Sequence, residues 1–78
     1  MTTDPLPDWV LPRRQQIGAI IRTARTERGL TQIQLGELAG MDHKTVHRIE
    51  YGTSDPSLTM LLRLASALRV PLADLVRE

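Results

Sequence analysis

Four side chains that can bind a metal ion or donate hydrogen bonds fall within six consecutive residues: His43, Lys44, His47 and Arg48. The two histidines are four residues apart, a spacing that places both imidazoles on one face of a helix and that zinc sites use. In the zinc-protease pattern a glutamate follows the first histidine, whereas here the cation Lys44 follows it. No third ligand is evident, and Lys44 and Arg48 would repel a cation. We therefore expect no metal ion and no cofactor.

The same four residues have a second chemistry, which is hydrogen-bond donation to a nucleic acid. Lys44 and Arg48 can donate to guanine O6 and N7, and arginine can do so as a bidentate fork. His43 or His47 can donate one hydrogen bond to a base acceptor or to a phosphate. A helix whose N-terminal end enters the major groove presents its first two turns to the base edges. We therefore predict base contacts for all four residues, the alternative being a solvated polar helix face.

The charge distribution agrees with a polyanionic partner. The net charge is only +1, but residues 13–48 hold seven basic and three acidic residues, so the rest of the chain is acidic. Such asymmetry suits a nucleic acid on one side of the molecule. Charge alone leaves open the alternative that these are scattered, solvated side chains.

Other function classes have little support in the sequence. No nucleophile–base pair and no phosphate-cradling loop is present, so we expect no enzyme activity. There is no cysteine, which excludes disulfides and thiolate metal sites. The start of the chain lacks the basic residues and the apolar run of a secretory signal, and no stretch is apolar enough to cross a bilayer. We expect a cytoplasmic protein with no membrane contact.

The 78 residues predict one domain, residues 13–78, after an extended leader, residues 1–12. The leader holds three prolines and no helical period. Its Trp9 has two open interpretations, an anchor packed on the body or part of a loose segment. From Arg13 the pattern is helical, with a shared apolar face, and Gly29 ends that helix. The apolar face comprises Ile17, Ile20, Ile21 and Ala24.

Capping residues divide the rest of the chain into four more helices. Thr31 precedes a helix over 32–39 that Gly40 ends, and Asp42 precedes a helix from 43 to about 51 that Gly52 ends. Ser57 precedes a fourth helix with an apolar face, and Pro71 begins a last one that reaches about residue 77. The expected face of the fourth helix is Leu58, Leu61, Leu62, Ala65 and Leu68. Nothing alternates with period two, so the fold class is all-α.

The segment 32–51 contains the most specific spacing in the chain. Gly36 is small enough for two helices to cross closely, Gly40 allows a sharp turn, and Val46 is an apolar residue that fills the crossing. This is the spacing of two short helices joined by a tight turn. It is much more specific than a lone pair of glycines.

The sequence from Ile17 to Leu75 resembles the phage-repressor-like (Cro/C1, Xre-type) helix-turn-helix family. The resemblance rests on many residues at fixed spacing, which are Gly29-Leu30-Thr31-Gln32, Leu35, Ala39-Gly40, Thr45-Val46, Arg48-Ile49-Glu50, Gly52, Pro56-Ser57-Leu58, Leu61, Leu64-Ala65 and Ala67-Leu68. Two positions depart from the family pattern. The family usually has alanine at Gly36, a change that costs about 0.5–1 kcal/mol in a helix, and often glycine at Arg69.

The resemblance implies a compact, lambda-repressor-like domain of five helices whose third helix lies in the major groove of DNA. It also implies that Gln32 contacts a phosphate, and that Arg25 and Glu50 form a salt bridge that leaves Arg25 partly free for phosphate. Thr45, Arg13 and Arg14 are further candidates for phosphate contacts, and for the two arginines solvation is the alternative. The function implied is a sequence-specific, double-stranded-DNA-binding transcriptional regulator, in particular a repressor.

A single small domain contacts about half a site, so we expect a homodimer. The last helix and its neighbour supply apolar residues beyond what so small a core needs. We expect the interface to comprise Leu64, Leu72, Leu75 and Val76. Two alternatives remain, an antitoxin that binds both a protein toxin and its own operator, and a restriction-modification controller protein.

Overall fold

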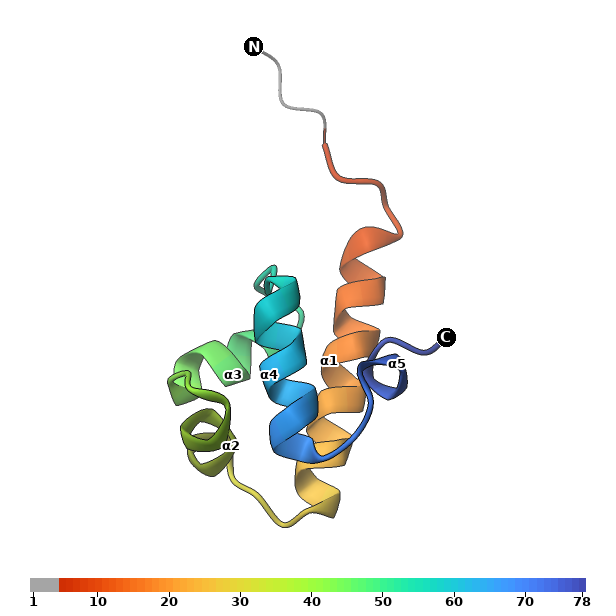
Figure 1. The fold of residues 1–78 in the computed structure, drawn as a ribbon. Helices are drawn as coiled ribbons and strands as arrows, with labels where there is room; N and C mark the ends of the chain where they lie inside the picture. Colours follow the sequence, from red (N-terminus) through yellow and green to blue (C-terminus); the bar gives the residue numbers. More distant parts are fainter. Residues whose placement is uncertain (1–4) are drawn as a thin grey trace.

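The computed structural model describes residues 5–78, and these form five helices without a strand (Figure 1). The helices are α1 (Val10–Glu27), α2 (Gln32–Ala39), α3 (His43–Glu50), α4 (Leu58–Leu68) and α5 (Leu72–Leu75). α2 and α3 lie together at one side, α4 lies between them and α1 in this view, and α5 packs beside α1 (Figure 1). The all-α class and the five-helix architecture are confirmed. No helix within residues 5–78 is both long and apolar enough to span a membrane.

The first helix begins earlier than predicted. It starts at Val10 rather than at Arg13, so the expected extended leader over residues 1–12 is wrong for its last three residues. Pro12 lies in the first turn, where proline has no intrahelical hydrogen bond to lose, and so it does not delay the helix. Trp9 is 68% exposed and does not anchor the segment to the body. Residues 1–4 of the predicted leader lie outside the described residues.

Local capping sets the starts of three helices as predicted. Thr31 and Gln34 form a capping box at α2, with the Thr31 hydroxyl accepting from the Gln34 N–H at 3.0 Å. The Asp42 carboxylate accepts from the Thr45 N–H at 2.8 Å at α3, and the Ser57 hydroxyl accepts from the Met60 N–H at 3.1 Å at α4. Each cap supplies an oxygen to a backbone donor that has no partner within its helix.

The core lies where all five helices meet and is built from aliphatic residues. Its members are Ile21, Leu35, Ala39, Val46, Ile49, Leu64, Ala65, Leu68 and Leu75. The predicted face of α4 was partly wrong, since Leu58 and Leu62 are 63% and 49% exposed. Leu61, Ala65 and Leu68 pack inward as predicted, together with Leu64, which the predicted face omitted. Leu58 and Leu62, four residues apart, lie away from the core.

Burial also corrects the predicted dimer interface. Leu64 and Leu75 are fully buried inside the monomer, at 0% exposure, so their side chains cannot reach a second copy. The core of this small monomer needs both leucines. The sequence-based prediction underestimated how many apolar residues the core would take up. Leu72 and Val76 are partly buried at the edge of the core and keep some exposed surface.

The last turn and helix differ in detail from the prediction. α5 ends at Leu75, short of residue 77. Arg69 follows α4 with φ 59° and ψ 40°, which is a left-handed conformation. Among the described residues, no other residue except glycine has a positive φ. That conformation is the one expected if α4 ends as it does in the family.

Candidate nucleic-acid interface

The third helix divides cleanly into an inner and an outer side. Val46 and Ile49 are 0% and 3% exposed and fix α3 to the core. The four predicted base-reading residues all lie on the outer side, exposed to solvent, and they are His43, Lys44, His47 and Arg48. α3 therefore presents two imidazoles and two cations along one exposed surface.

The turn between α2 and α3 is as tight as the sequence predicted. Gly40 ends α2 with φ 74° and ψ 37°, and the Met41 N–H donates back to the Gly36 carbonyl at 2.9 Å. A Cβ at Gly36 would lie 2.4 Å from the Met41 carbonyl oxygen. The glycine that replaces the family's usual alanine therefore allows the turn to approach α2 directly.

A second close approach, at Gly18 on α1, was missed by the sequence analysis. A Cβ at Gly18 would lie 2.4 Å from the carbonyl oxygens of both Ile49 and Glu50. The backbone of α1 thus touches the C-terminal end of α3 with no side chain between them. A glycine inside an apolar helical pattern was the available signal, because such a residue often marks close packing.

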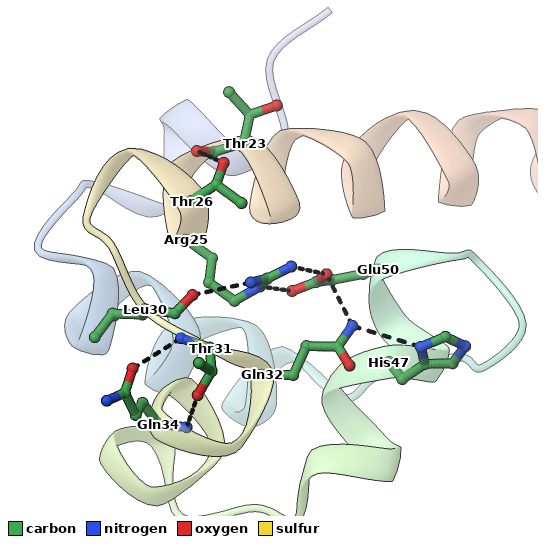
Figure 2. A network of polar contacts seen from close by, with 9 residues as sticks. All are labelled: Thr23, Arg25, Thr26, Leu30, Thr31, Gln32, Gln34, His47 and Glu50. Carbon is green, nitrogen blue, oxygen red and sulfur yellow. Dashed lines mark hydrogen bonds and ion pairs between the residues drawn. The ribbon is translucent and has the colours of Figure 1, made fainter.

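The predicted salt bridge between Arg25 and Glu50 is confirmed, and it is bidentate. Arg25 Nε donates to Glu50 Oε2 at 2.6 Å, and Nη2 donates to Oε1 at 3.0 Å (Figure 2). The hydrogen bond to Glu50 raises the pKa of Arg25 above its ordinary value. Arg25 Nη1 also donates to the Leu30 carbonyl at 2.9 Å, so three of its five N–H groups are engaged within the protein, and the partial availability of Arg25 for phosphate stays a prediction.

The side-chain amide of Gln32 points inward rather than toward solvent. Its Nε2 donates to Glu50 Oε1 at 3.2 Å and lies 3.5 Å from His47 Nδ1 (Figure 2). Both amide hydrogens are therefore directed at protein acceptors, which leaves the side chain no free donor for a phosphate. The backbone N–H at the start of α2 remains a suitable group for that role.

An aromatic contact extends the exposed surface of α3 to α1. The rings of His47 and Tyr51 lie 4.7 Å apart, and the Arg22 guanidinium carbon lies 4.9 Å from the centre of the Tyr51 ring. A cation over an aromatic face is held by electrostatic attraction. The sequence analysis missed Arg22 and Tyr51. The four-residue spacing of His47 and Tyr51 signals their contact, but nothing in the sequence pairs Arg22 with them.

The two N-terminal arginines have different surroundings. All three guanidinium nitrogens of Arg13 are engaged, by the Gln16 side chain, the Val76 carbonyl and the Glu78 carboxylate. Arg13 therefore fastens the C-terminal segment to α1, while its Nη1 and Nη2 each keep a second N–H, so its phosphate contact stays a prediction. Arg14 lines a small cavity with Ser54 and Asp55, and its Nε is buried with no protein partner among residues 5–78.

The start of α3 carries an electrostatic feature of its own. The Thr45 N–H, which donates to the Asp42 carboxylate, lowers the pKa of that carboxyl below its ordinary value. Asp42 is thus held as an anion at the positive end of the helix dipole. The described residues contain no cluster of three or more side chains suited to a metal ion.

The fold is a compact bundle in which a glycine turn joins two short helices, α2 and α3, and the outer side of α3 is polar. This arrangement defines a helix-turn-helix DNA-binding protein. The Helix-turn-helix family model matches residues 21–75 of the chain. The chain belongs to this family, as the sequence resemblance predicted.

Several known proteins are similar to the chain. An immunity repressor protein of Bacillus phage phi105 is 37% identical over 62 residues, and the match covers 80% of this chain but only 43% of the repressor. The restriction-modification controller protein C.AhdI from Aeromonas hydrophila has a structure with a TM-score of 0.77 and 34% identity, covering 82% of this chain and 96% of the controller. The clp gene regulator ClgR from Corynebacterium glutamicum has a TM-score of 0.77 and 26% identity, covering 94% of this chain and 87% of that chain.

Proposed function

We propose that the protein is a transcriptional regulator that binds specific sequences of double-stranded DNA through α3. The observation that carries this proposal is the division of α3 into a buried inner side and an outer side made only of donors and cations. The width of the major groove accommodates a helix presented in this way. The membership in the helix-turn-helix family and the similarity to named regulators support the same function.

In this proposal Lys44 and Arg48 donate to base edges, with Arg48 suited to guanine. His43 and His47 supply single hydrogen bonds. Phosphates are contacted by the backbone N–H groups at the start of α2 and by Thr45, which lies half-buried beside the base-reading residues. Arg14 is a further phosphate candidate.

We also propose that the protein acts as a homodimer. Two copies would place their reading helices about 34–36 Å apart, which matches half-sites one helical turn apart. Of the four residues predicted for the interface, Leu72 and Val76 keep exposed surface and remain available. Sedimentation as a monomer at tens of micromolar, both alone and with DNA, would contradict the dimer.

Repression is the favoured direction of regulation because one relative is an immunity repressor. The proposed function needs no catalysis and operates in the cytoplasm. A controller protein of a restriction-modification system is a specific second candidate, since C.AhdI matches over 96% of its own length. An antitoxin that binds a protein toxin is a third, and a second protein recovered in a fixed ratio with this chain from native lysate would favour it.

The direct test is to select bound sequences from random DNA and then to titrate variants on the selected site. Lys44→Ala and Arg48→Ala should each lose about 1–3 kcal/mol of binding free energy and should relax the preference at one base pair. Arg77→Ala, which removes an exposed cation near the end of the chain, is the matched control. An equal loss on every sequence would show that α3 holds DNA without reading it. Failure to select any sequence would contradict specific DNA binding.

A further inference from the structure

A chain of polar contacts runs from the interior of the molecule to an exposed imidazole on α3. It begins at Arg25, passes through Glu50 and Gln32, and ends at Nδ1 of His47 (Figure 2). The four residues come from α1, α2 and α3. Each link restricts the hydrogen-bonding state of the next.

The first links fix the orientation of the Gln32 amide. Glu50 is fully buried and paired with Arg25, so it is an ionised carboxylate and can only accept hydrogen bonds. Gln32 must therefore turn its NH₂ group toward Glu50, with Nε2 at 3.2 Å from Oε1. The reversed amide would place its oxygen against the carboxylate, with no proton between them. The second hydrogen of the same NH₂ group is then directed at His47 Nδ1, 3.5 Å away.

The last link fixes the histidine. A donor facing Nδ1 favours the neutral imidazole that has a lone pair on Nδ1 and its proton on Nε2. The Tyr51 ring, 4.7 Å from that of His47, restricts rotation of the imidazole. Nε2 lies on the opposite side of the ring from Gln32, on the exposed outer side of α3 (Figure 2).

We infer that His47 reads a purine N7 in the major groove through an Nε2–H donor that the contacts of Arg25, Glu50 and Gln32 hold in place. The part that concerns DNA rests on the proposed function. Adenine and guanine both present N7 as an acceptor and thymine presents O4, so a single fixed donor selects against cytosine, whose major-groove edge offers an N–H donor, and contact at N7 itself restricts the choice to a purine. His47 and Arg48, neighbours on one helix, then differ in what they specify. Arg48 is suited to guanine alone, and His47 accepts either purine.

The protein without DNA provides the first test. In ¹⁵N-labelled protein, at a pH where the imidazoles are neutral, NMR correlations between ring nitrogens and carbon-bound protons report which nitrogen carries the proton. His47 should be protonated almost entirely on Nε2, whereas His43, which has no protein partner in the described residues, should show a mixture of both forms. Gln32→Met, which keeps the side-chain length but removes the donor, should give His47 the same mixture. A proton on Nδ1, or equal populations at His43 and His47 in the unsubstituted protein, would overturn the inference even if the variant failed to fold.

The second test uses the selected DNA site with 7-deaza purines, which lack N7, introduced one at a time. At one purine in each half-site this change should weaken binding of the unsubstituted protein by about threefold to tenfold, the worth of one net hydrogen bond. The same change should leave His47→Ala unaffected, while Arg77→Ala should respond like the unsubstituted protein. If no purine shows this coupling, His47 does not read N7. If no DNA is bound at all, the proposed function fails while the NMR result still stands.

Discussion

α3 and α5 both pack against α1, but the two helices are held by different kinds of contact. α3 lies directly against the backbone of Gly18 and is joined to α1 by the bidentate Arg25–Glu50 pair. α5 is held by the burial of Leu75 and by the guanidinium of Arg13, which binds the chain just after it.

The turns that lead into the two helices differ in the same way. Both use a left-handed residue, but before α3 it is Gly40, which adopts this conformation freely, and before α5 it is Arg69, which does so under strain. The comparison shows which helix has its position fixed more strictly. α3, which presents the exposed donors, is held by a backbone contact and a bidentate ion pair that allow little movement. α5 is held by apolar packing, which can adjust, and follows a strained turn.

Of the changes that separate α3 from α5, breaking the Arg25–Glu50 ion pair should have the largest effect on stability. Arg25→Met should lower the free energy of unfolding by about 3–5 kcal/mol, because it leaves the fully buried Glu50 carboxylate without its cation. Glu50→Gln should cost less, because the Arg25 side chain remains 13% exposed and can turn toward water. Denaturant titrations measure both variants, with Arg77→Met as control. Equal losses of stability in the two variants would show that the difference in burial between Arg25 and Glu50 does not determine the cost of breaking the pair.

Gly18→Ala tests the close backbone contact. The added Cβ must displace the end of α3, and overpacking of this kind costs about 1–3 kcal/mol of stability. Affinity for the selected DNA should fall as well, since the helix that moves is the proposed reader. Gly29→Ala is the matched control, because a Cβ there meets nothing within 4 Å and only its positive φ of 67° is strained. A Gly18 variant that binds DNA normally would mean that α3 and α1 can separate without consequence.

The strained turn before α5 predicts a smaller change of opposite sign. Arg69→Gly should raise the free energy of unfolding by up to about 1 kcal/mol, because left-handed strain of about 1–2 kcal/mol is removed at some cost in unfolded-chain entropy. Thermal melts of the two proteins decide the matter. A lower melting temperature in the glycine variant would show that Arg69 makes a contact that outweighs its strain. DNA affinity should be unchanged.

The smallest effect concerns the cap of α3. Because folding lowers the pKa of Asp42 from its ordinary value of 3.8, its stabilising contribution is present above that value and is lost as the pH falls through the lower, folded value. Asp42→Asn keeps a capping oxygen but cannot titrate. Its stability should therefore depend less on pH below 3.8 than that of the unsubstituted protein. Parallel pH curves for the two proteins would rule out this contribution.

Features set by neighbouring residues in the chain could be predicted from the sequence. The caps at Thr31, Asp42 and Ser57, and the turn at Gly40, depend on short-range geometry, and the structure has them as expected. The Arg25–Glu50 pair is a long-range contact, and only the family resemblance made it predictable.

The errors arose where the answer depends on which elements pack together. Leu58 and Leu64 are equally apolar in the sequence, and only the angle at which α4 meets the core decides that one is exposed and the other buried. Likewise, Arg13 contacts Val76 because the C-terminal segment returns to α1, and Gln32 points inward because Glu50 lies there. Gly18 is different, since its position within a helix was a signal that went unused.

The separation between the two sides of α3 has a consequence for protein engineering. Three of the outward residues, His43, Lys44 and Arg48, form no side-chain hydrogen bond or ion pair within the described part of the chain, so a library at these positions can vary sequence preference while the scaffold stays constant. His47 is the exception, since replacing it also removes an acceptor from Gln32. A library should therefore vary residues 32 and 47 together, whereas residues 43, 44 and 48 can be varied independently.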